Sequence, residues 1–326
     1  MSLYTRLRTH GTLAEAPGDI PDAVFALPST LHWMRAEAIL VRELDVNFGT
    51  ARHTYRTVQR RAMTDREANS VFEQLLFSLN QIAALRALNA APNKADVARV
   101  GIVTWYYGHY GAASAMIAAA DGSFPETHAT TAMQWDRQIV AANLSMPPFS
   151  DWIADLGADL DVSLAAVRAR GRHSLTLTPA TPAQAWGCHA EYLSGTAKWE
   201  RDNLEQRVRG SREFRELGVE NFRTKAAREL RDRAFAGRSI SFLHQASRYR
   251  GKANYRDAIY LAYGRAVTQQ ADGFIDDLLS VLTGFSAMAA AYCSIRMGRA
   301  LWEPFIDDLE TGRAISISPY EVWSEA

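Results

Sequence analysis

The stretch ADGFIDDLLSVLTGFSAMAAAYCSI, residues 271–295, repeats apolar side chains at alternating steps of three and four residues. The series consists of Ala271, Phe274, Leu278, Val281, Phe285, Met288, Tyr292 and Ile295. Side chains spaced in this way share one face of an α-helix, as in coiled coils and helical bundles. The spacing therefore predicts a long helix that packs against a partner, either within this chain or on another subunit.

Two further long helices are predicted upstream of this stretch. Thr64 and Glu67 have the spacing of a capping box, and an apolar stripe from Val71 to Ala83 follows them. A second helix is predicted from Lys94 to about Ala120. Its small residues lie close to one face: Gly101, Gly108, Gly111, Ala112, Ala115 and Ala119. Because glycine costs about 1 kcal/mol in a helix interior, we expect a neighbouring backbone to approach this face closely.

The predicted fold class is an all-α helical bundle with long antiparallel helices and a helical insertion. Its predicted parts are an N-terminal arm (1–30), the first part of the bundle (31–143), a helical insertion or separate lobe (144–210), the second part of the bundle with a basic segment (211–300), and a C-terminal tail (301–326). Within these parts, 151–156 is expected to form a short helix, 171–182 an extended connector, and the tail to be mostly irregular. A second helix is expected after Gly49, through residues 50–62.

The charge of the chain is balanced overall but uneven along its length. The 326 residues are 48% hydrophobic and 22% charged, with 36 basic and 36 acidic side chains, which is typical of a globular protein. Residues 207–256 contain fourteen Lys or Arg and five Asp or Glu, whereas residues 271–326 contain three and nine. The two regions could attract each other within one fold or across a dimer, the basic one could face phosphate, or both could be solvated helical faces.

Several cofactor and metal sites are excluded by the absence of their motifs. The sequence has no GxGxxG, GxxxxGK[ST], HExxH, GxSxG or paired Glu-x-x-His pattern. Cys188 and Cys293 lack a CxxC partner, so we expect two buried apolar thiols and neither a disulfide nor a zinc site. The sequence therefore predicts no cofactor and no metal.

A cytoplasmic location without membrane association is expected by elimination. Residues 1–20 contain four charged side chains and no apolar run, unlike a signal peptide. The nearest approach to a membrane span is residues 273–295, which contains Asp276 and Asp277.

Two short motifs carry a family resemblance. Residues 105–117, WYYGHYGAASAMI, resemble the Tyr-Tyr-x-x-Phe-His-Ala-Ala helix of HEPN (higher eukaryote and prokaryote nucleotide-binding) domains, and residues 250–255, RGKANY, are similar to the Arg-x-x-Ala-Asp-Tyr segment of that family. The order of the elements also fits. This sequence departs from the family pattern at Gly111, where the family usually has His, and at Asn254 and Tyr255, which stand where Asp and often His occur.

The resemblance implies a helical bundle that usually dimerises. Many HEPN proteins are metal-independent ribonucleases of toxin–antitoxin and anti-phage systems, with an Arg-x4–6-His catalytic motif, and others are inactive binding or dimerisation modules. An Arg-x5-His match occurs from Arg238 to His244, and Gly237 precedes it. On an ideal helix, two side chains six residues apart point about 120° away from each other. Arg238 and His244 could therefore converge only if the helix is broken at Gly237. Another match, Arg168 to His173, lies in a glycine-containing loop and is interpreted as chance.

The resemblance and the residues together give a candidate site. His244 would act as acid or base, Arg238 or Arg250 would bind phosphate, and Tyr255 could donate a hydrogen bond. Four further residues would contact the RNA: Arg248, Lys252, Asn254 and Arg256. The alternative is a structural role, with His244 a partly buried helical histidine and with Arg250 and Tyr255 joined to the bundle by a salt bridge and a packed ring.

The leading hypothesis is a dimeric HEPN-like endoribonuclease of a bacterial toxin or defence system, with RNA as substrate and a cognate defence or antitoxin protein as a possible partner. The first alternative is a non-catalytic HEPN-like module that binds a nucleotide or a protein. The second is an unrelated helical scaffold in which the 271–295 seam is the functional surface.

Overall fold

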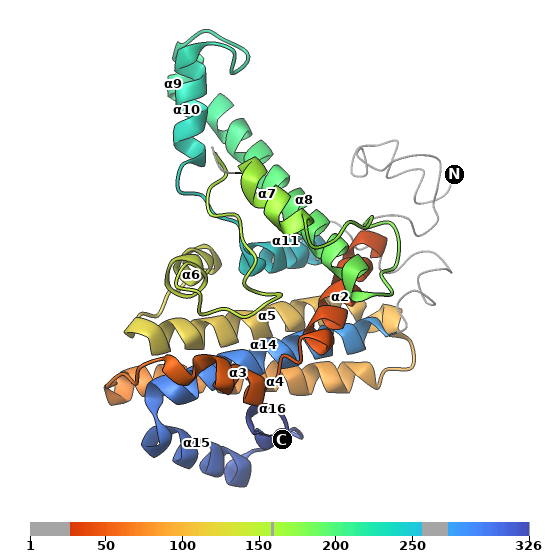
Figure 1. Cartoon of the computed structure of the whole chain (residues 1–326), viewed down its shortest axis with the longest axis vertical. Coiled ribbons are helices and arrows are strands. Elements are labelled where there is room, and N and C mark those ends of the chain that lie inside the picture. Colours follow the sequence, from red (N-terminus) through yellow and green to blue (C-terminus); the bar gives the residue numbers. More distant parts are fainter. Residues whose placement is uncertain (1–26, 158–159, 256–272, 326) are drawn as a thin grey trace.

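The computed structural model describes residues 27–157, 160–255 and 273–325, and within these ranges every regular element is a helix (Figure 1). The only extended pairing in the described part is one isolated antiparallel bridge between Ile153 and Ile240. The predicted all-α helical bundle is therefore confirmed. Most of the predicted N-terminal arm, up to residue 26, lies outside the described residues.

Three long helices form the body of the bundle: α4 (Asp65–Asn89), α5 (Lys94–Asp121) and α14 (Phe274–Met297). They lie side by side, with α2 (Leu27–Glu43) and α3 (Phe48–Thr54) packed against α14 (Figure 1). The start of α4 is the predicted capping box, in which Thr64 and Glu67 satisfy each other's backbone donors. The capping-box pattern therefore predicted the start of α4 correctly.

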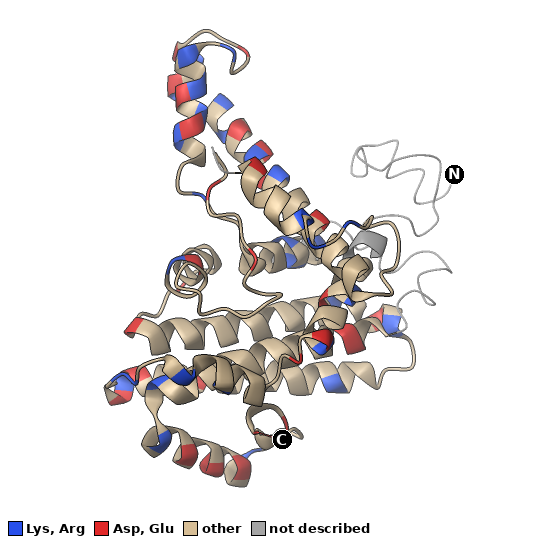
Figure 2. Cartoon of the chain, viewed as in Figure 1, with Lys and Arg blue, Asp and Glu red and all other residues tan. Residues whose placement is uncertain are grey.

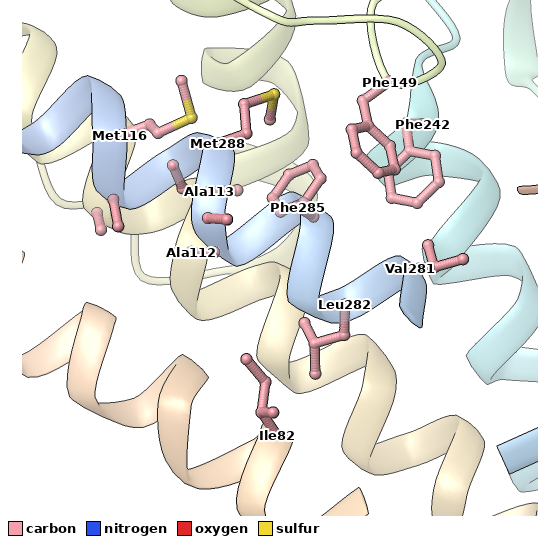
Figure 3. Packing of buried hydrophobic residues seen from close by; sticks show 14 of the residues in the cluster. Ile82, Ala112, Ala113, Met116, Phe149, Phe242, Val281, Leu282, Phe285 and Met288 are labelled. Atoms are coloured by element: carbon pink, nitrogen blue, oxygen red, sulfur yellow. The ribbon is translucent and has the colours of Figure 1, made fainter. Parts of the chain in front are cut away.

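The helix α14 is the centre of the core. Phe274, Leu278, Val281, Phe285, Met288 and Tyr292 are all at most 2% exposed, and Figure 3 shows how several of them meet residues of α4, α5 and α11 (Phe242–Tyr255). Ala271, the first member of the predicted seam, lies outside the described residues. The partner of the seam lies within this chain, since α2, α3, α4 and α5 all contact α14. The apolar face of α14 is therefore covered by other helices of the same chain and is not exposed for assembly.

By length and composition, α14 is the one helix in the described ranges that could cross a membrane. However, 78% of its apolar window is buried inside the fold. This burial is what is expected of the central helix of a soluble bundle, whose apolar side chains face other helices.

The glycine face of α5 allows the predicted close approach. A Cβ at Gly108 would lie 2.5 Å from a Leu282 methyl group of α14, and one at Gly111 would lie 3.0 Å from the Gln74 carbonyl oxygen of α4. The Leu282 methyl group is the end of a flexible side chain and could give way, whereas the Gln74 carbonyl is backbone, so a Cβ at Gly111 would press α5 away from α4. Gly111 therefore sets the spacing of α5 against α4.

The chain leaves the bundle after α5 and returns to it at α11. It passes through α6 (His128–Trp135), a π-turn η2 (Asp136–Val140) and α7 (Leu160–Arg168) before the long α8 (Pro182–Arg209). The second half of α8, with α9 (Arg212–Glu216) and α10 (Lys225–Phe235), projects away from the bundle (Figure 1). We call residues 198–235 the arm.

Four expectations differ from the structure. Residues 151–156 are not helical, because Ile153 pairs with Ile240. The helix after Gly49 is shorter than predicted, since α3 ends at Thr54 and only the 3-10 turn η1 (Tyr55–Thr57) continues it. The C-terminal tail is not irregular: it contains α15 (Arg299–Gly312) and α16 (Tyr320–Trp323). The predicted boundary at 210 falls inside the arm, because α9 and α10 pack on α8.

Candidate functional site

The segment that leads into α11 is held in an extended conformation. Ile153 and Ile240 each donate a backbone hydrogen bond to the other, at 2.8 and 2.9 Å, and the Leu156 amide donates to the carbonyl oxygen of Arg238 at 2.9 Å. Gly237 starts the segment with φ +68°, a left-handed conformation that favours glycine. Arg238 therefore lies off the regular helix, as predicted, and its side chain is exposed.

His244 lies in the first turn of α11 and is fixed through one ring nitrogen. Its Nδ1 lies 3.3 Å from both the amide nitrogen and the Oγ of Ser241, and 3.6 Å from Oδ2 of Asp136. The side chain is 29% exposed. All three contacts use Nδ1, so Nε2 lies on the opposite side of the ring.

Asp136 is a buried carboxylate at the start of the π-turn. It is 3% exposed, and burial raises its pKa, while the charge of His244 and the hydroxyls of Ser239 and Ser241 act in the opposite direction. Ser239 Oγ donates a short hydrogen bond to Oδ2, and within the described part of the chain Oδ1 has no hydrogen-bond partner. The Ala141 amide donates to the Asp136 carbonyl at 2.8 Å, which closes the π-turn, a feature frequent at functional sites.

This arrangement suits both protonation states of His244. In the neutral ring, Nδ1 can accept the hydrogen bond that the Ser241 amide donates; in the protonated ring, Nδ1–H faces the Asp136 carboxylate. A nearby buried carboxylate orients an imidazole and stabilises its protonated form. When Nδ1 carries the hydrogen and faces the Asp136 carboxylate, Nε2 can accept a proton and release it again. The tautomer that accepts from the Ser241 amide holds its hydrogen on Nε2 and can only donate it.

Arg250 belongs to a different cluster. Its guanidinium lies over the ring of Tyr106, 4.7 Å from the ring centre. His128 packs against the rings of Tyr106, Tyr107 and Tyr110 at 4.7 to 5.7 Å, and burial and the charge of Arg250 both lower its pKa. The contacts of Arg250 are thus aromatic, while those of His244 are with serine and aspartate. The structure does not bring these two candidate residues into one contact.

The other candidate residues do not share one face. Arg248 points to α8, where its Nη1 donates to Thr196 Oγ1 at 3.1 Å. Asn254 accepts a hydrogen bond from Arg99 through its backbone carbonyl oxygen, at 2.9 Å, and Lys252 lies two residues earlier in the last turns of α11. The side chain of Tyr255 and the whole of Arg256 lie outside the described residues.

The aromatic helix that carries the first family motif forms part of the core. His109 is fully buried, its Nδ1 donates to the Trp105 carbonyl oxygen at 2.9 Å, and burial lowers its pKa to about 3. Its ring packs on Phe285. A histidine that stays neutral in the core has a structural role here, so this motif adds no second acid or base.

The chain matches no protein-family model, no curated protein and no solved structure at a significant level. The site is therefore judged on its own geometry. The sequence singled out His244 and Arg238 as candidates, but not Asp136, Ser239 and Ser241, which the structure places in contact with His244 or with one another. Ser241 could have been found, since a serine three residues before His244 has the spacing of a helix cap. Nothing in the sequence near Asp136 distinguishes it from a solvent-facing acid.

Proposed function

We propose that this chain is a metal-independent endoribonuclease in which His244 exchanges the proton, Asp136 positions and stabilises the imidazole, and Arg238 binds the phosphate. The observation that carries the proposal is the contact of His244 Nδ1 with the buried Asp136 carboxylate, at 3.6 Å. The HEPN resemblance supports the further proposal of a dimer in a bacterial toxin or anti-phage defence system, controlled by a cognate antitoxin or defence protein, and with it we propose a cytoplasmic location.

The chemistry needs few groups. The 2′-oxygen of RNA attacks the adjacent phosphorus and loses its proton, the bond to the 5′-oxygen breaks, and a 2′,3′-cyclic phosphate and a 5′-hydroxyl result. His244 Nε2 would accept the 2′-proton or deliver one to the leaving oxygen. A guanidinium stabilises the charge that develops on the phosphate oxygens.

Arg238 suits the phosphate role better than Arg250. Its side chain is exposed, and its backbone is fixed by Leu156 just before the first turn of α11. Arg250 is placed over Tyr106, and its Nε is buried without a hydrogen-bond partner among the described residues. A guanidinium in that position stabilises the packing of α11 on α5.

The test is cleavage of 5′-labelled tRNA in the presence of EDTA. We expect His244→Ala to lower the rate 10²- to 10⁴-fold, the usual contribution of general acid–base catalysis. Arg238→Ala should lower it strongly as well, whereas Arg250→Ala should act mainly on stability. Asp136→Asn should reduce the rate less and change its pH dependence, because a neutral amide no longer stabilises the protonated imidazole.

Two matched controls complete the test. His53→Ala removes another histidine, whose Nε2 lies 2.7 Å from Arg56, and Arg233→Ala removes an exposed arginine of α10. Both should leave the rate unchanged. Absence of cleavage by the unmodified chain, or an undiminished rate in His244→Ala, contradicts the proposal; tRNA that binds tightly and stays intact would favour a non-catalytic module.

A further inference from the structure

A second candidate site lies between the end of α7 and α8, away from the contacts of His244. It is a pocket of about 850 Å³, a size typical of small-molecule sites. Its lining combines polar and apolar surface and includes two arginines: Arg168, Arg172, His173, Ser174, Leu175, Thr176 and Glu191. Two arginines and a histidine face a single carboxylate, so the pocket carries an excess of positive charge.

The loop that forms the pocket lies directly against α8. A Cβ at Gly171 would lie 2.2 Å from the Ala183 carbonyl oxygen, and one at Gly187 would lie 2.2 Å from the His173 amide nitrogen. Only glycine permits either approach. The position of the His173 backbone is therefore set by the sequence of α8 as well as by the loop.

Both ends of the loop are anchored by polar contacts. Arg170 stacks on Trp186 at 4.0 Å and pairs with Asp151, which lies 3.0 Å from Nε2 of the buried His189. At the other end, His32 contacts the Leu175 carbonyl oxygen through Nδ1 and Thr178 Oγ1 through Nε2, both at 2.9 Å. The loop is thus organised before any ligand binds, which lowers the entropic cost of binding.

Two nitrogen atoms of the lining residues lack partners. His173 Nε2 and Arg168 Nε are buried, and in the described ranges neither makes a hydrogen bond. Arg168 Nε lies 3.5 Å from Glu191 Oε1, close enough for charge attraction but without hydrogen-bond geometry. Buried polar atoms are normally hydrogen-bonded, so these two nitrogens leave hydrogen-bonding capacity unused beside the pocket.

We infer that this pocket binds a small phosphomonoester with a hydroxyl-bearing body, such as a sugar phosphate. A phosphomonoester carries close to two negative charges and three acceptor oxygens, which matches two arginine forks, one imidazole and the Ser174 and Thr176 hydroxyls. A phosphodiester of RNA offers one charge and two such oxygens. Glu191 is placed to accept hydrogen bonds from hydroxyl groups of the ligand body.

The test is isothermal titration calorimetry on the full chain, with ribose 5-phosphate, ribose and inorganic phosphate as probes. We expect ribose 5-phosphate to bind, inorganic phosphate to bind more weakly, and ribose alone to give no heat. Arg168→Ala and Arg172→Ala should each weaken ribose 5-phosphate at least tenfold. Glu191→Gln should tighten inorganic phosphate but reduce the advantage of ribose 5-phosphate over it.

Arg209→Ala is the matched control, because Arg209 lies on α8 outside the pocket, where it pairs with Glu205 and lies over the ring of Phe222. It should bind like the unmodified chain, and thermal melts should show that all variants remain folded. The inference is overturned if no phosphate compound binds, if Arg172→Ala and Arg209→Ala behave alike, or if RNA without a terminal phosphate displaces ribose 5-phosphate at equal nucleotide concentration. The tRNA cleavage assay is independent of each of these outcomes.

Discussion

In the bundle of α4, α5 and α14 the helices meet through buried apolar side chains (Figure 3), whereas in the arm basic and acidic residues are interspersed along the helices (Figure 2) and guanidinium groups lie over aromatic rings. The bundle buries Phe285 completely among other rings. In the arm, Phe222 is half-buried and lies between the guanidiniums of Arg209 and Arg231, at 5.0 and 5.7 Å from their Cζ atoms. Both regions are helical, but different forces hold them together.

The comparison teaches why net charge alone was a poor guide to function. Many of the fourteen basic residues of 207–256 belong to the arm, where Figure 2 shows basic and acidic side chains interspersed. Several of its arginines pair with acids or cover aromatic rings, as Arg212 and Arg231 do. The excess of basic residues in this segment therefore serves largely to stabilise the arm. The proposed site depends instead on individual residues where the arm joins the bundle.

The largest predicted effect is in the bundle. Phe285→Ala should lower the free energy of unfolding by about 3–5 kcal/mol, because a fully buried ring is replaced by a cavity. Urea denaturation followed by circular dichroism measures it. Phe124→Ala is the control: this ring is 48% exposed and should change stability by about 0.5 kcal/mol or less. Equal effects of the two substitutions would contradict the assignment of α14 as the core helix.

Signals that lie within a few residues of each other were predictable from the sequence. The capping box at Thr64 and the glycine face of α5 both depend on local spacing, and both are confirmed. The 151–156 segment was predicted wrongly because its conformation depends on Ile240, far along the chain. The helix α15 was not predicted because it is stabilised by packing against the core and not by a local sequence signal. Trp302 and Ile306 are buried in that core, and Trp302 packs near Trp323 of α16.

The residues of the candidate site also divide into those that the sequence could single out and those that only the folded chain brings together. His244 could be singled out by its distance in sequence from Arg238 and by the family resemblance. Asp136 could not, because 108 positions separate it from His244 and only the packing of the α6–η2 segment brings the two together. Arg168 and His173, interpreted from the sequence as a chance match to the catalytic motif, both line the pocket beside α8, for which a separate role is inferred above.

A smaller effect is predicted for the aromatic centre of the arm. Phe222→Ala should cost about 1–2 kcal/mol, since each cation–π contact at a partly exposed ring contributes about 0.5–1 kcal/mol. Hydrogen exchange should show faster exchange of α9 and α10 amides, with α14 amides unchanged, because the arm has few contacts with the bundle core. Leu217→Ala, at a 37% exposed position nearby, serves as the control. Faster exchange throughout α14 would mean that the arm and the bundle unfold as one unit.

The smallest effect is predicted for a single ion pair of the arm. Arg212 Nε lies 2.6 Å from Glu216 Oε1 with spacing i, i+4, but the two side chains are 88% and 59% exposed. Water and salt screen such a pair, so a double-mutant cycle of Arg212→Ala and Glu216→Ala should give a coupling of about 0.3–0.5 kcal/mol. The coupling should vanish at 1 M salt, where the screening length is about 3 Å. A coupling above about 1 kcal/mol that survives salt would show that the arm is stabilised by a cooperative charge network and not by its aromatic contacts.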